Sequence, residues 1–125
     1  MAMSIKEIGE ALVNHCKNGT EAELQNTLYA DDAVSVEAMP NPETGKATTE
    51  GLDGIRGKHT WWNETMEAVK MNVHGPYPHG DSKFAVIFNG EAKTKADGKA
   101  FPIDEVAVYT VADGKIVREE FFYDM

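Results

Sequence analysis

The sequence predicts a single α+β domain in which helices come first and a meander of antiparallel strands follows, with the helices packed on one face of the sheet. In the first half of the chain, apolar residues recur every three or four positions, which is the spacing of one helix face. In the second half, pairs such as Asp97-Gly98 and Asp113-Gly114 separate runs rich in Val, Ile, Phe and Tyr, and such pairs are typical of hairpin turns.

Length, charge and cysteine content narrow the class of protein. A chain of 125 residues with 42% apolar content makes one ordinary domain, residues 1–125. Its formal charge of −9 repels nucleic acids and anionic membranes, so neither is an expected partner. Cys16 is the only cysteine, and no apolar run has the length of a signal peptide or a membrane span, so we expect a cytoplasmic protein.

Three helices are predicted. The first runs from Ile5 to the stop signal Asn18-Gly19. The second begins at the capping box Thr20-Glu-Ala-Glu23 and reaches about Tyr29. Asp53 caps the third helix, whose apolar stripe is formed by Ile55, His59, Trp62, Met66 and Val69.

Five strands are predicted, one before the third helix and four after it. The first covers residues 33–39 and ends at Pro40, where a loop to Glu50 begins. The other four form the meander, at residues 69–75, 82–95, 100–111 and 115–123. The predicted order is therefore helix, helix, strand, helix and four strands.

Three segments carry a resemblance to a known family. They are Leu28-Tyr-Ala-Asp-Asp-Ala-Val-Ser-Val-Glu37, Gly54-Ile-Arg-Gly57 and the last hairpin from Tyr109 to Phe122. Together with the element order they resemble the SnoaL-like domain of the nuclear transport factor 2-like superfamily, whose members include SnoaL-like polyketide cyclases and ketosteroid isomerases. The resemblance implies a cone-shaped, strongly curved mixed or antiparallel sheet around an apolar pocket. It also implies a homodimer through the outer sheet face, burying Ala107, Tyr109 and Phe122.

One comparison within that superfamily bears on chemistry. Pro102-Ile103-Asp104 resembles the setting of the oxyanion-hole aspartic acid in ketosteroid isomerases, so Asp104 is a candidate for that role. The position of the isomerase's proton-abstracting carboxylate aligns with Ala38, and that of its tyrosine with Leu12. Neither side chain can move a proton, so steroid isomerisation by that mechanism is not expected.

The register of the last hairpin decides which residues share a face. A two-residue turn at Asp113-Gly114 places Asp104, Val106 and Val108 on one face together with Glu119, Phe121 and Tyr123, and the resemblance suggests that this face lines the pocket. A bulge would shift one strand by a residue. Glu120 and Phe122 would then replace Glu119 and Tyr123.

Candidate proton-transfer groups follow from these positions. Asp104 beneath an apolar wall would be a general acid, although a strand-end aspartate at a solvated rim is an equal alternative. Glu119 could be a second carboxylate, or an ordinary solvated or ion-paired glutamate. His59 and His74 are candidate bases, and their alternatives are a core histidine and an ordinary turn residue.

The predicted walls of the pocket are aromatic and aliphatic. The residues are Trp62, Tyr29, Val106, Val108, Phe121 and Tyr123. The alternative for them is a contact in the core or in a dimer. The histidines lack the compact spacing of zinc motifs, and Gly51-Leu-Asp-Gly-Ile-Arg-Gly57 lacks that of a nucleotide loop, so neither a metal nor an organic cofactor is predicted.

Two classes of function remain open. The first is a cofactor-independent isomerase, cyclase or hydratase/dehydratase that acts on a small hydrophobic molecule by proton transfer. The second is a noncatalytic module for small-molecule binding or dimerisation, because two expected catalytic positions are occupied by Ala38 and Leu12.

Overall fold

The computed structural model of the protein describes residues 4–41 and 44–123. Among these residues, two helices, two strands and a third helix fill the first half, and four strands fill the second. In chain order the elements are α1 (Ile5–Asn18), α2 (Glu21–Thr27), β1 (Tyr29–Val36), β2 (Thr48–Glu50), α3 (Leu52–Thr65), β3 (Met66–His79), β4 (Lys83–Thr94), β5 (Ala100–Ala112) and β6 (Lys115–Phe122).

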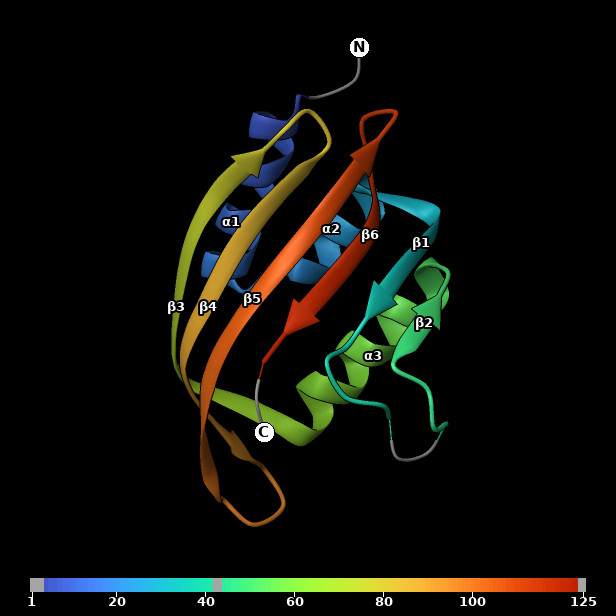
Figure 1. The fold of residues 1–125 in the computed structure, drawn as a ribbon. Coiled ribbons are helices and arrows are strands. Elements are labelled where there is room, and N and C mark those ends of the chain that lie inside the picture. The colour runs from blue at the N-terminus through green and yellow to red at the C-terminus, as the bar shows by residue number, and fades with distance from the viewer. Residues whose placement is uncertain (1–3, 42–43, 124–125) are drawn as a thin grey trace.

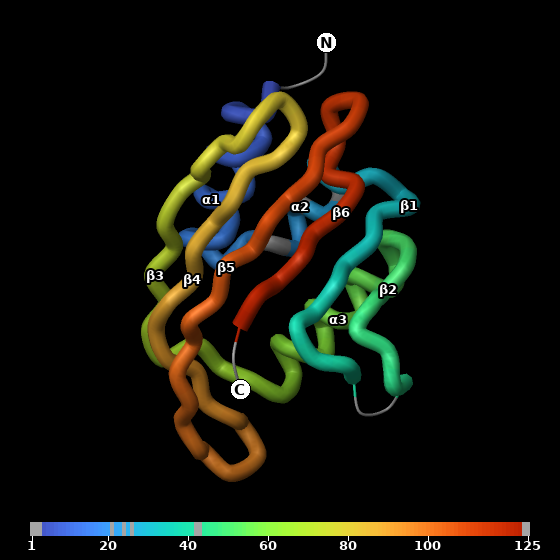
Figure 2. Tube along the Cα trace, viewed as in Figure 1, coloured from blue at the N-terminus to red at the C-terminus, as the bar shows by residue number. Residues whose placement is uncertain are grey.

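The described residues form one six-stranded sheet in the order β2-β1-β6-β5-β4-β3. β1 runs parallel to β6, and every other neighbouring pair is antiparallel. The sheet is strongly curved, and α1 and α2 lie behind its concave face while α3 lies beside β1 and β2 (Figure 1). The predicted α+β class, with three helices against a curved mixed sheet, is confirmed. The trace in Figure 2 shows β6 running between β1 and β5.

The first helix forms as predicted because its ends are capped and one face is apolar. The Ser4 hydroxyl accepts from the Glu7 amide, and the Glu7 carboxylate accepts from the Ser4 amide, which satisfies two free donors. Gly19 ends the helix with a φ of 70°. Ile8 and Leu12 are buried on the inner face.

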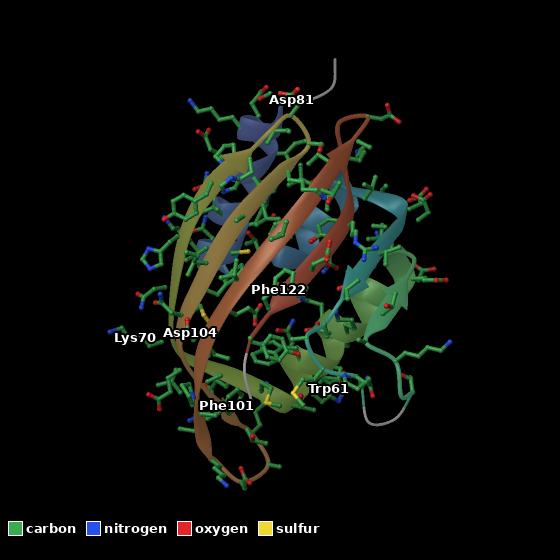
Figure 3. The ribbon with its side chains drawn as sticks, viewed as in Figure 1. Trp61, Lys70, Asp81, Phe101, Asp104 and Phe122 are labelled. Carbon is green, nitrogen blue, oxygen red and sulfur yellow. The ribbon has the colours of Figure 1, made fainter. Side chains whose placement is uncertain are left out.

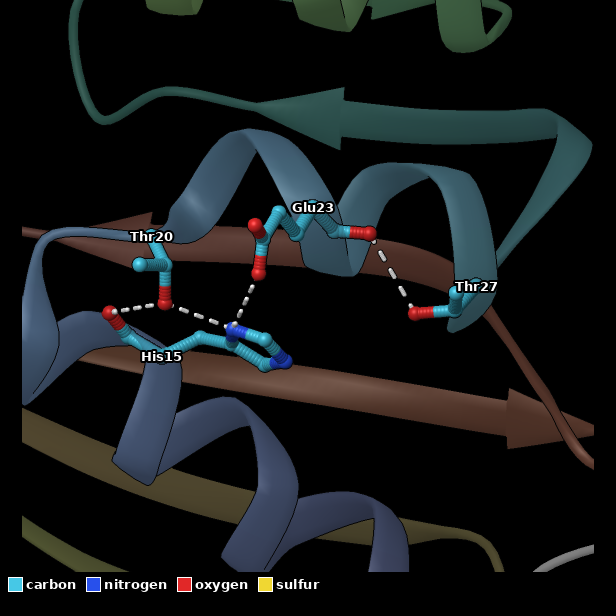
Figure 4. Close-up of polar contacts among 4 residues, drawn as sticks. All are labelled: His15, Thr20, Glu23 and Thr27. Carbon is cyan, nitrogen blue, oxygen red and sulfur yellow. Dashed lines mark hydrogen bonds and ion pairs between the residues drawn. The ribbon is translucent and has the colours of Figure 1, made fainter.

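The junction between α1 and α2 differs from the predicted capping box (Figure 4). The Thr20 hydroxyl lies 2.7 Å from His15 Nδ1 and 3.4 Å from the His15 carbonyl oxygen. The Glu23 carboxylate lies 4.0 Å from the same ring nitrogen. Thr20 and Glu23 thus contact the end of the preceding helix, because the short connection at Gly19 brings His15 within reach.

The structure corrects four details of the predicted elements. β1 begins at Tyr29, just after α2. β2 lies inside the predicted loop. Its three residues are too few to show a pattern in the sequence, and they form a strand because they pair with β1. Gly51 precedes α3 with a φ of 86° and offers no side-chain cap, so the predicted role of Asp53 is wrong. Met66 and Val69 belong to β3, not to the third helix.

The last hairpin has the predicted turn and the alternative register. Ala112 pairs with Lys115 across Asp113-Gly114, as a two-residue turn requires. A bulge follows, however, because Val111 pairs with Ile116 while Thr110 pairs with Arg118, which leaves Val117 without a partner in the ladder. Beyond it Tyr109 lies opposite Glu119, so β5 and β6 share faces in the shifted arrangement.

The core lies between the concave face of the sheet and the helices. Phe84 and Tyr109 stack with ring centroids 5.0 Å apart and are almost fully buried, and helix residues cover them. Gly9 permits this packing, because a Cβ there would overlap the Pro76 ring. The buried apolar set is completed by Val13, Leu28, Tyr29, Ala33, Leu52, Ile55, Val73, Val86, Ala107 and Ile116.

Candidate active site

Asp104 lies on the exposed face of the sheet, which corrects the prediction that it looks into the interior. Burial alternates along β5, with Asp104 and Val106 exposed and Glu105 and Ala107 turned inward. Val108 shares the outer face and is only half-buried. Figure 3 shows Asp104 on β5 and Phe122 at the end of β6. The physical reason is the bulge in β6, which shifts β6 against β5 so that Glu105, and not Asp104, shares a face with Glu119. The alternation of the sequence does not reveal this bulge.

Glu119 is the carboxylate that the fold places inside. Its side chain comes from β6 and is 6% exposed. The Tyr29 hydroxyl donates to Glu119 Oε2 at 3.3 Å, and the Ser35 hydroxyl donates to the same carboxylate. Tyr29 and Ser35 both come from β1, the parallel neighbour of β6, and Ser35 is fully buried opposite Glu119 in the ladder.

An ion pair continues this network toward solvent. Lys58 Nζ of α3 lies 2.6 Å from Ser35 Oγ and 2.5 Å from Glu37 Oε1, and the side chains of Lys58 and Glu37 are 26% and 30% exposed. The Tyr123 hydroxyl donates to Glu37 Oε2 at 3.1 Å. The Lys58 ammonium also lies 5.3 Å from the centre of the Phe121 ring.

A third carboxylate, Glu105, completes what we call the Glu119 cluster, namely Tyr29, Ser35, Glu37, Lys58, Glu105, Glu119 and Tyr123. Glu105 lies on the inner face of β5, and its charge interacts with those of Glu37, Lys58 and Glu119. The cluster therefore gathers three carboxylates and one ammonium group on the concave side of the sheet, from β1, α3, β5 and β6.

Burial changes the ionisation of these groups. Burial raises the pKa of Glu119 to about 7, although the Lys58 charge and the Tyr29 hydrogen bond oppose it. Burial, reinforced by the Glu37 charge, likewise raises the pKa of Glu105 to about 7. Burial and then the Glu119 charge raise the pKa of Tyr29 well above its usual value, and burial and the Glu37 charge raise that of Tyr123 to about 12. Near neutral pH the carboxyls can thus exchange protons, whereas both phenols keep theirs.

Sequence reasoning found part of this cluster. Glu119, Tyr123, Phe121 and Tyr29 were expected at the pocket, and the structure brings all four inward. Lys58, Glu37, Ser35 and Glu105 were not selected. Available signals are the helical spacing of Lys58 from Ile55 and Trp62, and the two-residue spacing of Ala33 and Ser35 on β1 with Glu37 just after it.

The other candidates lie outside the cluster. His59 is half-buried on α3, and His74 is exposed on β3 opposite Ile87. Trp62 is half-buried and meets Phe101 edge to face, with ring centroids 6.5 Å apart. Trp62 thus packs against β5 near the long β4–β5 hairpin. Among the described residues, neither histidine is one of the groups that act on Glu119.

The pocket itself stays a prediction. Two surface cavities of about 250 and 240 Å³ are lined by residues 90–91 and 100–102 and by residues of α1 with Gly75 and Pro76, respectively. Neither is lined by a residue of the Glu119 cluster. The cluster opens to solvent instead through the partly exposed side chains of Lys58, Glu37 and Tyr123.

One further group of side chains and the possible metal ligands bear on two other known types of site. Thr20, His15 and Glu23 have the residue types of a catalytic triad, but the hydroxyl and the carboxylate both contact Nδ1. A triad needs one partner on each ring nitrogen. Across residues 4–41 and 44–123, no group of three or more His, Cys, Asp or Glu side chains is arranged to hold a metal ion.

Comparisons with known proteins agree with this architecture. The family model of the SnoaL-like domain matches residues 3–123. A solved structure described as a SnoaL-like polyketide cyclase from Mesorhizobium loti is 38% identical to this chain, with a TM-score of 0.87. The match covers 97% of this chain and 100% of that one. A search of curated proteins finds no match.

More distant solved structures share the fold. A nuclear transport factor 2-like protein from Burkholderia thailandensis E264 is 18% identical with a TM-score of 0.79, covering 98% of this chain and 92% of that one. A protein with a ketosteroid isomerase-like fold from Catenulispora acidiphila DSM 44928, in complex with trimethylamine, is 19% identical with a TM-score of 0.72, covering 95% of this chain and 86% of that one.

In the described residues, no helix has the length and apolar content needed to cross a bilayer.

Proposed function

Because the chain belongs to the SnoaL-like domain family, we propose that it is a cofactor-independent enzyme that moves a proton on a small hydrophobic molecule, with Glu119 as the acid and base. Isomerisation, ring closure and hydration or dehydration all fit this chemistry. Each passes through an enolate-like state, which a buried donor can protonate or stabilise.

The single observation that supports this function is the setting of Glu119. It is a buried carboxyl with a pKa of about 7, held by the hydroxyls of Tyr29 and Ser35. General acid–base catalysis works best when the pKa of the group lies near the working pH, because both protonation states are then populated. An ordinary exposed carboxylate such as Asp104 lacks this setting.

The neighbouring side chains take supporting roles. Tyr29 keeps its proton at neutral pH and can donate to an oxygen on which negative charge develops. Phe121 and Tyr123 supply the aromatic surface around the cluster, and Trp62 extends it along α3. His59, half-buried on α3, stays a candidate second base.

An exchange experiment tests Glu119. The probe is a panel of small cyclic ketones in D2O, and ¹H NMR follows the loss of protons on the carbon next to the carbonyl. We expect the protein to accelerate exchange for at least one ketone, and Glu119→Gln to lower that rate by about 10²–10⁴-fold. The matched control is Asp104→Asn, which changes an exposed carboxylate and leaves the rate unchanged. Equal rates for Glu119→Gln and the unaltered protein would contradict the assignment.

A noncatalytic binding or dimerisation module is the competing function. One observation favours it, because no buried side-chain nitrogen or oxygen in the described residues lacks a hydrogen-bond partner. A self-satisfied network of this kind also serves a purely structural core. The ketone exchange separates the two functions: no acceleration for any ketone favours the module, and an acceleration that Glu119→Gln removes favours catalysis.

We also propose that the protein is cytoplasmic and that it forms a homodimer through the outer face of the sheet. Val106 and Phe122 are neighbours there across β5 and β6 and are 38% and 52% exposed. Large apolar side chains exposed side by side are typical of interaction surfaces. Ala107 and Tyr109 are buried on the inner face, so their expected place in that interface is wrong. The lone Cys16 suits a reducing compartment.

A further inference from the structure

We propose that Lys58 is a positioning residue that orients the Ser35 hydroxyl toward Glu119 and couples this buried carboxyl to the Glu37 carboxylate at the rim. A role of Lys58 in catalysis rests on the proposed function of Glu119 as the acid and base. The physical content of its positioning role is a chain of contacts from Glu119 of β6 through Ser35 of β1 to Lys58 of α3, and from there to Glu37 just after β1.

The direction of each hydrogen bond follows from the donors available. An ammonium group has only donors, so Lys58 Nζ donates to Ser35 Oγ at 2.6 Å. A serine hydroxyl has a single hydrogen, which Lys58 cannot accept. That hydrogen is therefore left for the Glu119 carboxylate, and Ser35 acts as a donor to it together with Tyr29.

The second partner of Lys58 keeps the ammonium in place. Glu37 Oε1 lies 2.5 Å from Nζ, and Tyr123 donates to the other oxygen of Glu37. The Phe121 ring lies under the same ammonium group. Lys58 is thus held by contacts from β1 and β6, and its long side chain does not need to reorder when Glu119 changes its charge.

Charges from every packed element act on Glu119. Burial raises its pKa most, the Lys58 charge from α3 and the hydrogen bonds of Tyr29 and Ser35 lower it, and the Glu37 charge raises it. Glu105 on β5 faces the same space and interacts with Glu119. The remaining titratable groups near Tyr29 are Tyr109 of β5 and Cys16 of α1. Lys58 is therefore the cation that opposes the two carboxylates near Glu119, which are Glu37 and Glu105.

The experiment titrates the glutamate side chains directly. Protein labelled with ¹³C at the glutamate carboxyl carbons is titrated by NMR from acidic to alkaline pH, and Glu119→Gln identifies the Glu119 signal. Lys58→Met removes the charge but keeps the length of the side chain, Lys58→Arg keeps the charge, and Glu37→Gln removes the rim carboxylate. Lys70→Met is the matched control, because Lys70 is exposed on β3 and points away from the sheet (Figure 3).

Opposite shifts are the expected result. Lys58→Met should raise the Glu119 midpoint by roughly one pH unit or more, since the nearest cation is lost. Glu37→Gln should lower it, since a neighbouring negative charge is lost. Lys58→Arg should restore most of the original midpoint, and Lys70→Met should leave it unchanged. A general loosening of the fold would instead lower the midpoint in both cluster variants, toward the value of an exposed carboxyl.

Three results would overturn the role of Lys58. They are an unchanged midpoint in Lys58→Met, a lowered midpoint in both cluster variants, and a midpoint in Glu37→Gln that does not fall. The last overturns the coupling of Glu119 to Glu37 even where Lys58→Met does not fold. Failure of the proposed function gives a different result, because the unaltered protein then accelerates exchange of no ketone while the midpoint shifts of the Lys58 and Glu37 variants are still observed.

Discussion

The Tyr29 hydroxyl donates a hydrogen bond to Glu119 Oε2 at 3.3 Å, between residues 90 positions apart in the sequence. The parallel pairing of β1 with β6 makes this contact, and a register shift in β1 after Tyr29 lets Ser35 face Glu119 as well. Two donors from one strand thus flank a buried carboxyl of the next. The stability and ionisation of the protein should depend on this arrangement.

Replacing Glu119 with Gln should change how stability depends on pH. The pKa of Glu119 is about 7 in the folded protein and 4.5 in the reference state, so its contribution is fully present below about pH 4.5 and is lost as the pH rises through 7. Glutamine has no such proton to lose. Urea unfolding should give equal free energies at pH 4, and a free energy for Glu119→Gln that is higher by on the order of 3 kcal/mol at pH 8.5.

The matched control for this pH effect is Glu50→Gln, because Glu50 is an exposed glutamate of β2. Its unfolding free energy should follow that of the unaltered protein at both pH values. A constant difference between Glu119→Gln and the unaltered protein from pH 4 to pH 8.5 would show that Glu119 titrates normally.

Removing the Tyr29 hydroxyl should weaken the carboxylate form of Glu119. Tyr29→Phe keeps the buried ring but deletes the donor to Oε2. We expect a loss of about 1 kcal/mol of unfolding free energy above pH 8 and a smaller loss at pH 5, where Glu119 carries a proton. In a Glu119→Gln background the pH dependence of this loss should disappear. A loss of equal size at both pH values in both backgrounds would assign Tyr29 to packing alone.

Two glycines should respond to alanine in opposite directions. Gly90 of β4 has a φ of +153°, and a Cβ there would overlap the carbonyl oxygen of Lys70, so Gly90→Ala should cost about 3 kcal/mol or more of unfolding free energy. Gly57 of α3 faces open space, so Gly57→Ala should add about 0.5–1 kcal/mol. Thermal unfolding of both variants checks the pair, and a tolerated Gly90→Ala would contradict the close approach of β3 and β4.

The outer sheet face should control association. Phe122→Arg places a charge beside Val106 on this face and should convert a dimer to a monomer in sedimentation velocity at micromolar concentration. Thr60→Arg is the control, because Thr60 is exposed on α3 and lies away from that face. A monomer in the unaltered protein would exclude the homodimer at once.

The site shows where sequence reasoning succeeds and where it stops. Glu119 and Tyr29 were selected by residue type and approximate position, and both are at the centre of the cluster. Asp104 was selected on the same grounds and lies outside, because the extra residue at Val117 shifts β6 against β5. A strand has a two-residue period, so a single bulged residue exchanges its two faces.

The class and the order of the elements follow from local signals in the sequence. Helical spacing in α1 and the Asp-Gly turns of the meander are such signals, and each is present within a dozen neighbouring residues. Long-range packing sets the parallel pairing of β1 with β6, the existence of β2 and the contacts of Lys58 with Ser35 and Glu37. These contacts join distant segments, and their free energy depends on burial and charge that arise only when the sheet curves around its core.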